Sequence, residues 1–265
     1  MGHTVRELLS QRELRIAEYH CSSGPEDVPF EEQFRATSVA FVRGGSFAIR
    51  SPRGAAALGP GSLVLGNARE PYTCSHEGRG DLCLSFRYGE RLVDEVAGGA
   101  TFRRPALPAG PLMALPAVVD AAVSGKGPSL EEVAIEVLGR ALEADATRTL
   151  RPEAPRAADE RRAQEAMRFI DAHAGEPLTL RGLAGRARLS AYHFLRSFRA
   201  AAGTTPHQYL LGARLRRAAA LLLGSDLPVT GIAYEAGFGD LSNFIRTFRR
   251  ATGRSPRAFR EARGL

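Results

Sequence analysis

The chain has 265 residues, a length that suggests about two domains. Apolar residues make up 44% of the sequence, enough for ordinary hydrophobic cores, and no run of about twenty apolar residues predicts a membrane span. Charges recur throughout residues 1–20, which excludes a secretory signal peptide, and Cys21, Cys74 and Cys83 provide no disulfide framework. We therefore expect a cytoplasmic protein with reduced thiols.

The net charge of +7 is unevenly distributed along the chain. Residues 1–150 contain 16 basic and 19 acidic residues, whereas residues 151–265 contain 20 basic and 10 acidic ones. Nearly all the basic residues are arginines, but a general bias towards arginine does not explain the difference between the two halves. A basic segment beside a neutral-to-acidic one indicates a polyanionic partner for the basic segment alone.

The first half has the pattern of short strands. In the stretch SVAFVRGGSFAIRS, residues 38–51, two apolar runs flank Gly44 and Gly45, which is typical of a β-hairpin. Further short apolar runs bounded by turn residues continue to about residue 100. Strands at this spacing predict a small antiparallel β-barrel or β-sandwich, and we expect a barrel over about residues 1–105.

Several metal-binding residue types fall within this predicted barrel. The stretch HEGRG, residues 76–80, has the composition of a hairpin loop, and a hairpin closing around it places Cys74 opposite Cys83. His76 is two residues from Cys74 and lies on the same face of the strand. Cys74, His76 and Cys83 are therefore a candidate metal or redox site. The alternative, two small buried apolar residues beside a surface histidine, remains open.

Over about residues 110–145, the apolar residues recur with a helical period. In SLEEVAIEVLGRALEAD, residues 129–145, one stripe of the predicted helix is apolar. The stripe consists of Val133, Val137, Leu138, Ala141 and Leu142. It suits either self-association or packing on the chain's own barrel. Residues 146–160 combine prolines with small and charged residues, which predicts a linker between a domain of residues 1–145 and one of residues 161–265.

The second half contains one pattern twice. SAYHFLRSFRAAAGTTP at 190–206 returns as DLSNFIRTFRRATGRSP at 240–256, with seven identities in seventeen positions. Each copy predicts a short helix, a tight turn with small residues and a longer helix, at about 191–202 and about 241–252. This is the helix-turn-helix pattern.

Capping residues predict where these helices begin. Ser190 and Asp240 are the expected N-caps of the two longer helices, and Asp159 that of the first helix of the domain. Between the two copies a long helix carries three arginines that we expect to be mainly on the surface. They are Arg214, Arg216 and Arg217.

The longer helix of each copy has two distinct faces. Phe194 and Phe198, like Phe244 and Phe248, are four residues apart and anchor one face to a core. The opposite faces present Tyr192, His193, Arg196 and Ala200 in the first copy, and Ser242, Asn243, Arg246 and Arg250 in the second. An arginine in the middle of a rigid helix suits a DNA major groove, where it can pair bidentately with guanine.

The stretch GIAYEAGFGDLSNFIRTFRRATGRSPRAFR, residues 231–260, resembles the C-terminal signature of the AraC/XylS family of transcriptional regulators. The matching positions are Ile232, Ala233, Gly237, Phe238, Phe244, Arg246, Phe248, Arg249, Gly253, Ser255, Pro256, Phe259 and Arg260. The resemblance covers about residues 161–265 and implies seven helices. It also implies two recognition helices in successive major grooves, roughly 34 Å apart.

The resemblance further implies a set of DNA-contacting residues. They are Tyr192, Leu195, Arg196, Leu241, Ser242, Ile245 and Arg246, with Asn243 on the same exposed face, while Arg199 and Arg249 face phosphate or solvent. Leu195 and Ile245 depart from the polar residues common at these positions in the family. Contact with thymine methyl groups and inward packing both remain open for them.

For the first half, the resemblance implies a cupin-like sensor barrel with a helical dimerisation segment, so the whole chain is expected to be of the α+β class. The expected partners are double-stranded DNA, RNA polymerase for an activator, a small-molecule effector in the barrel and a second copy in a homodimer. No membrane partner and no cofactor are expected.

Two alternatives remain. A non-specific nucleoid-associated protein has the same charge but does not require two matched recognition faces. A cupin enzyme with an appended DNA-binding module requires a convergent histidine and carboxylate set, and only His76 and Glu77 stand together in the barrel. We therefore expect no enzymatic activity.

Overall fold

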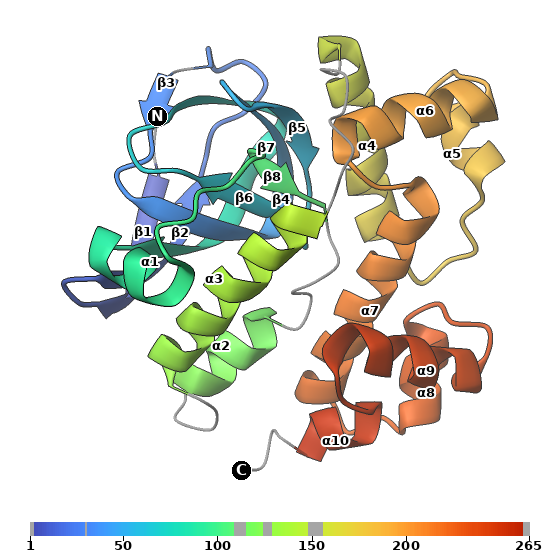
Figure 1. The fold of residues 1–265 in the computed structure, drawn as a ribbon. Helices are drawn as coiled ribbons and strands as arrows, with labels where there is room; N and C mark the ends of the chain where they lie inside the picture. The colour runs from blue at the N-terminus through green and yellow to red at the C-terminus, as the bar shows by residue number, and fades with distance from the viewer. Residues whose placement is uncertain (1–2, 30, 109–114, 124–128, 148–155, 262–265) are drawn as a thin grey trace.

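The computed structural model describes residues 3–29, 31–108, 115–123, 129–147 and 156–261. One half is an antiparallel sheet curled into a barrel with three helices against it, and the other half is entirely helical (Figure 1). The predicted α+β class is confirmed. No helix among these residues is long and apolar enough to cross a membrane.

The sheet is built around two long strands that pair with each other, β4 and β7. Its path runs β1-β2-β7-β4-β6-β8, with β3 pairing β7 and β5 pairing β4, and every pair is antiparallel. The strands are β1 His3–Ser10, β2 Leu14–Cys21, β3 Glu31–Gln33, β4 Thr37–Ser51, β5 Gly54–Leu58, β6 Leu63–Gly66, β7 Pro71–Tyr88 and β8 Ala106–Leu107.

The hairpin predicted at Gly44 and Gly45 is wrong, because both residues lie inside the continuous strand β4. The register of β4 against β7 shifts between Val42 and Gly44 and again between Gly45 and Phe47. Gly45 has a φ of +77°, and a Cβ there would lie 2.3 Å from the carbonyl oxygen of Gly80. The glycines therefore mark a bulge with close backbone approach, a signal that resembles a turn in sequence.

The hairpin predicted around residues 76–80 is also wrong. These residues belong to β7, which continues through them to Tyr88. Cys74 pairs with Ile49 of β4, whereas Cys83 pairs with Val42 of the same strand, so the two cysteines do not face each other.

The apolar stripe of the predicted helix is covered by the chain's own barrel. Helices α1 (Glu90–Ala97), α2 (Leu115–Val123) and α3 (Leu130–Thr147) lie on one face of the sheet. Val133, Val137, Leu138 and Ala141 of α3 are buried there and Leu142 is partly buried. Of the two interpretations of this stripe, the structure supports packing on the barrel.

Residues 156–261 contain seven helices, as the resemblance implied. They are α4 Ala157–Ala172, α5 Leu180–Arg186, α6 Ala191–Ala202, α7 Pro206–Gly224, α8 Val229–Glu235, α9 Leu241–Thr252 and α10 Pro256–Glu261. Helix α3 ends at Thr147 and α4 begins at Ala157, so both extend into the predicted linker.

The prediction that Asp159 is an N-cap is wrong, because the N-cap of α4 is Arg156. The two alanines before Asp159 are strong helix formers and extend the helix by one turn at its start. Asp159 lies instead in the first turn of α4 and pairs with Arg162 at 3.3 Å.

Helix α4 docks the helical half onto the barrel (Figure 1). Arg50 of β4 donates to both carboxylate oxygens of Glu160 at 2.7 Å, and the Glu160 side chain is only 4% exposed. Arg168 donates to the hydroxyl of Ser46 at 3.3 Å. Ala57 of β5 is buried in the core of the helical half, so the contact between the two halves is apolar as well as polar.

Candidate nucleic-acid interface

The first helix-turn-helix unit consists of α5 and α6. The side chain of Thr179 accepts from the backbone N–H of Gly182 to cap α5, and that of Ser190 accepts from His193 to cap α6, as predicted for Ser190. Between the helices Arg188 has a φ of +54°, an uncommon conformation for a residue other than glycine. Phe194 and Phe198 are fully buried, which fixes one face of α6.

The second unit repeats this arrangement in α8 and α9. The Asp240 carboxylate accepts from the backbone N–H of Asn243 at 2.6 Å, so it caps α9 as predicted. Phe244 and Phe248 are buried, and the Phe248 ring packs edge-on against Phe259 at 5.2 Å. At the turn, Gly237 has a φ of +89°.

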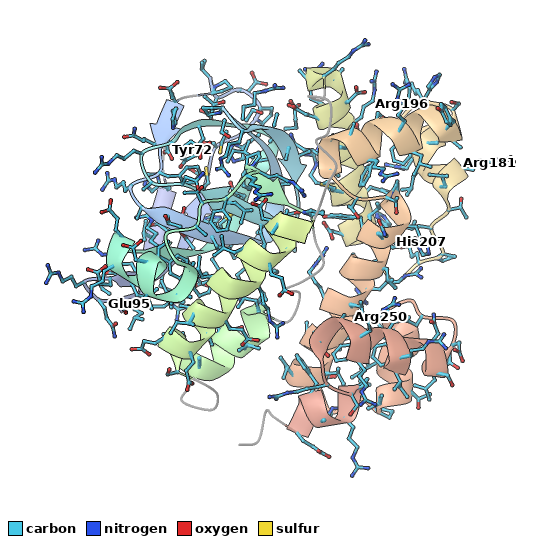
Figure 2. All side chains as sticks on the ribbon, viewed as in Figure 1. Tyr72, Glu95, Arg181, Arg196, His207 and Arg250 are labelled. Carbon is cyan, nitrogen blue, oxygen red and sulfur yellow. The ribbon has the colours of Figure 1, made fainter. Side chains whose placement is uncertain are left out.

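The predicted contact face of α6 is turned towards solvent. Tyr192 is 69% exposed, and His193, Arg196 and Arg199 are exposed as well. Figure 2 shows Arg196 projecting from α6. Leu195 is partly buried, so one side of its side chain faces the core and the other faces solvent.

The predicted contact face of α9 is more open. Ser242, Asn243, Arg246, Arg249 and Arg250 are all exposed. Ile245 is 38% exposed, an unusual position for a large aliphatic side chain, and with these neighbours it lines a shallow hollow of about 670 Å³. Leu241 is partly buried against the core of the second unit.

A weak internal contact orients the central arginine of α9. A terminal nitrogen of Arg246 donates to Oδ1 of Asn243 at 3.4 Å, and the hydroxyl of Thr247 donates to the same oxygen at 3.4 Å. Asn243 therefore presents its amide nitrogen outwards while its oxygen faces Arg246. The arrangement leaves the remaining guanidinium donors of Arg246 available to a partner.

Helix α7 joins the two units end to end (Figure 1), and its arginines fix their orientation. The expectation that these arginines are mainly on the surface is wrong for Arg214 and Arg216, which are half-buried. Arg214 donates to the carbonyl oxygens of Ala174 and Glu176 at 2.9 Å, and Arg217 donates to the carbonyl oxygen of Glu235 at 3.0 Å. No local sequence pattern predicts these backbone acceptors, since they lie about forty and eighteen residues away along the chain.

A partly buried carboxylate completes the connection between α4 and α7. Asp171 accepts from the hydroxyl of Tyr209 at 2.7 Å and from Arg216 at 2.6 Å. Burial raises the pKa of Asp171, although Arg216 and Tyr209 act in the opposite direction. Burial raises the pKa of Tyr209 well above its ordinary value, and the neighbouring Asp171 carboxylate raises it further. The phenol therefore stays protonated and donates to Asp171.

The three residues predicted as a metal or redox site lie inside the barrel. The side chain of His76 is only 6% exposed and its Nε2 is 2.7 Å from Oδ1 of Asp81, so the alternative of a surface histidine is wrong. The thiol of Cys83 donates to Oδ2 of Asp81 at 3.1 Å. Burial, and then the Asp81 carboxylate, raise the pKa of Cys74 and of Cys83, which favours neutral thiols.

Comparisons with known proteins match the helical half. A family described as "Helix-turn-helix domain" matches residues 183–262. The HTH-type transcriptional activator RhaS of Citrobacter koseri is 36% identical over 102 residues, which cover 38% of this chain and 37% of that protein. The matched region therefore spans little more than a third of the length of this relative.

Two solved structures match a similar region. The DNA-binding domain of AdpA, a global transcriptional factor, in complex with a target DNA is 35% identical and covers 38% of this chain and 90% of that chain, with a TM-score of 0.37. A transcriptional regulator with an AraC-type DNA-binding domain from Chromobacterium violaceum is 29% identical. The match covers 42% of this chain and 98% of that chain, with a TM-score of 0.39.

The two capped units, their separate cores and the family match define the second half of the chain as a double helix-turn-helix domain. Residues 183–262 match this helix-turn-helix family, and the stretch between Ile232 and Arg260 resembles the AraC/XylS signature.

Proposed function

We propose that this chain is a sequence-specific DNA-binding transcription regulator, and that α6 and α9 enter successive major grooves. One observation carries the proposal above all others: two matched helices, each capped and anchored by two phenylalanines, present exposed arginines at opposite ends of α7. One such helix contacts few base pairs, and each good pairing discriminates by only about 1–3 kcal/mol. Two helices on one rigid connection double the sequence that is contacted.

The exposed side chains take different roles in this proposal. Arg196 and Arg246 occupy the middle of their helices and donate to guanine, whereas Arg199 and Arg249, one turn further on, contact phosphate. The exposure of Ile245 favours contact with a thymine methyl group. Tyr192, Ser242 and Asn243 lie near the helix N-termini, where they contact the backbone or a base edge. Leu241 and Leu195 mainly position their helices.

The remaining proposed partners are RNA polymerase, an effector and a second copy of the chain, and they rest on similarity to known regulators. RhaS is named a transcriptional activator, and we propose that this chain likewise activates transcription through contact with RNA polymerase. The barrel supplies the sensor, with an effector bound on its inner face. We also propose a homodimer, but the apolar stripe of α3 does not form it, because that stripe is buried on the barrel.

A binding map of the purified full chain on fragmented genomic DNA, at about 150 mM salt, tests this function. We expect few sharp sites, each with two short sequence boxes one helical turn apart. The matched control is the double variant Arg196→Ala, Arg246→Ala, which keeps both caps and both phenylalanine anchors and loses these sites. Diffuse binding that disappears with added salt, and that the double variant shares, supports the nucleoid-associated alternative instead.

A further inference from the structure

A wide bulge in β7 brings two polar side chains together inside the barrel. His76 pairs with Phe47 of β4, and Asp81 pairs with Gly45. Residues 77–80 of β7 therefore stand opposite the single residue Ser46, and the excess backbone forms the bulge. As a result, Nε2 of His76 lies 2.7 Å from Oδ1 of Asp81, although five positions separate the two residues.

Cys21 joins this pair from the neighbouring strand. It is the last residue of β2 and pairs with Asp81 across the β2–β7 ladder, so the two side chains share one face of the sheet. One ligand atom each of Cys21, His76 and Asp81 lies within 4.8 Å of the other two. The side chains of His76 and Asp81 are 6% and 9% exposed, while Cys21 is partly exposed, so the cluster is shielded from water without being closed off.

We propose that Cys21, His76 and Asp81 bind a divalent transition-metal ion of the zinc type. A thiolate sulfur, an imidazole nitrogen and a carboxylate oxygen are ordinary zinc ligands, at about 2.0–2.3 Å from the metal. In tetrahedral geometry such ligand atoms lie about 3–4 Å from each other. The three ligand atoms of this cluster lie within 4.8 Å of one another, close to that spacing.

Metal binding removes one proton from this cluster. The thiol proton of Cys21 is released to solvent, whereas neutral His76 keeps its single N–H, now on Nδ1, and its Nε2 exchanges the hydrogen bond to Asp81 for the metal. The fourth coordination position is then open to water or a small molecule.

Cys83 and Cys74 differ in their relation to this site. The Cys83 thiol donates to Oδ2 of Asp81 at 3.1 Å and so orients the carboxylate from outside the cluster. Cys74 pairs with Ile49 further along β7 and is outside the three-residue cluster. The site is therefore not the one predicted from the sequence, since it replaces Cys74 and Cys83 by Cys21 and Asp81 as ligands.

Cobalt titration of the full chain tests the site, because tetrahedral Co²⁺ bound to a thiolate gives visible bands and a sulfur-to-metal charge-transfer band. The reduced, metal-free protein is titrated with Co²⁺ alone, and Zn²⁺ is then added as a competitor. We expect one equivalent of Co²⁺ with a charge-transfer band that Zn²⁺ abolishes. Cys21→Ser should lose this band, and Cys83→Ser should weaken binding about 10- to 100-fold.

Cys74→Ser is the matched control, since it makes the same change at a cysteine of the same barrel and should bind Co²⁺ like the unaltered chain. Circular dichroism of each variant shows whether the barrel is folded. Cys21 is chosen for substitution because its side chain is partly exposed, so its replacement disturbs the core least. The inference is overturned by a protein that binds no stoichiometric Co²⁺. It is equally overturned if Cys21→Ser keeps the charge-transfer band.

The bulge that carries the site also contacts the helical half. The Phe47 ring lies 5.6 Å from the His76 ring, and the adjacent Ser46 accepts a hydrogen bond from Arg168 of α4 at 3.3 Å. A Cβ on Gly78 of the same bulge would lie 3.2 Å from the Arg168 guanidinium. A metal ion that tightens the bulge therefore acts next to the contact between barrel and DNA-binding domain.

This regulatory consequence rests on the proposed function, and a separate measurement tests it. The DNA affinity of the full chain is measured with and without Zn²⁺, with Cys21→Ser as the control. A change in Kd of about threefold or more that the variant lacks supports the metal as a signal. An unchanged Kd beside an intact Co²⁺ spectrum overturns the regulatory role alone, whereas no DNA binding under either condition contradicts the proposed function instead.

Discussion

The two helix-turn-helix units share one pattern but differ in what surrounds them. The first unit builds its core together with the barrel, since Ala57 of β5 is buried among its side chains and α4 carries the ion pair from Arg50 to Glu160. The second unit builds its core from α7 to α10 alone. Its recognition helix exposes Arg246, Arg249 and Arg250 around a shallow hollow.

This difference suggests a division of labour between the units. A change in the shape of the barrel acts first on α4 and α6, because both contact it, whereas α9 packs against α8 and α10. Under the proposed function, the second unit holds DNA whatever the state of the barrel, and the first unit responds to the barrel. Four substitutions separate these roles, beginning with the one of largest expected effect.

Gly237→Ala should damage the second unit most. A Cβ at Gly237 would lie 2.6 Å from the carbonyl oxygen of Ala174 and 2.9 Å from Nε of Arg214, and the residue has a φ of +89°. Left-handed backbone and overpacking together should cost about 3 kcal/mol of unfolding free energy. Chemical denaturation of the full chain, followed by circular dichroism, measures this loss.

The equivalent turn of the first unit provides the control. Arg188 already has a φ of +54° with an exposed side chain, so Arg188→Ala should change the unfolding free energy by less than about 0.5 kcal/mol. Equal losses for both variants would contradict the view that only the second turn requires glycine.

Arg246→Ala tests whether α9 contacts bases. Removing a bidentate contact to guanine should weaken binding to the cognate site by about 1–3 kcal/mol and relax specificity at one base pair. Arg249→Ala is the comparison, because its side chain is exposed on the same helix and is expected at phosphate. Fluorescence anisotropy on cognate and single-mismatch duplexes measures both. If Arg246→Ala weakens binding equally on all duplexes, Arg246 is a phosphate contact.

Tyr209→Phe loosens the first unit on α7 while the aromatic ring keeps its packing. The Tyr209 hydroxyl donates to the partly buried Asp171 carboxylate at 2.7 Å. Loss of this hydrogen bond should cost about 1 kcal/mol of unfolding free energy. Base specificity at the positions contacted by α9 should not change, because α9 belongs to the other core. Altered specificity at those positions would show that the two units are not independent.

The helical half could be predicted from the sequence because its signals are local. Ser190, Asp240 and the paired phenylalanines act within one or two turns of the same helix, and the structure places them as expected. The docking of α4 could not be predicted, because the acceptors of Arg168 and Arg50 are more than one hundred residues away in the chain.

The barrel shows the opposite case. Gly44 and Gly45 are typical of a turn, but their pairing with β7 makes them a bulge. The sequence around the two glycines carries no information about which strand lies beside them. The same bulge brings Asp81 to His76, and the pairing of β2 with β7 brings Cys21 to Asp81. The sequence pattern therefore points to His76, but only the strand pairing places Cys21 and Asp81 beside it.

The smallest expected effect concerns the pH dependence of the contact between barrel and first unit. Burial raises the pKa of Glu160, and the ion pair with Arg50 only partly opposes this. A carboxyl with a raised pKa is more easily protonated in the folded state than in the unfolded one. Its contribution to stability is therefore present below the ordinary glutamate pKa and falls as pH rises through the raised value.

Glu160→Gln removes this titration while it keeps the size of the side chain. The variant should gain stability relative to the unaltered chain as pH rises from 4 to 7, by less than about 1 kcal/mol because Arg50 is half exposed and the pair is screened. Denaturation midpoints of both proteins across this pH range measure the difference. Glu165→Gln, at an exposed position of the same helix, is the control and should show no such trend. If Glu160→Gln instead loses stability as pH rises, the ion pair with Arg50 outweighs burial, and the barrel holds the first unit by charge.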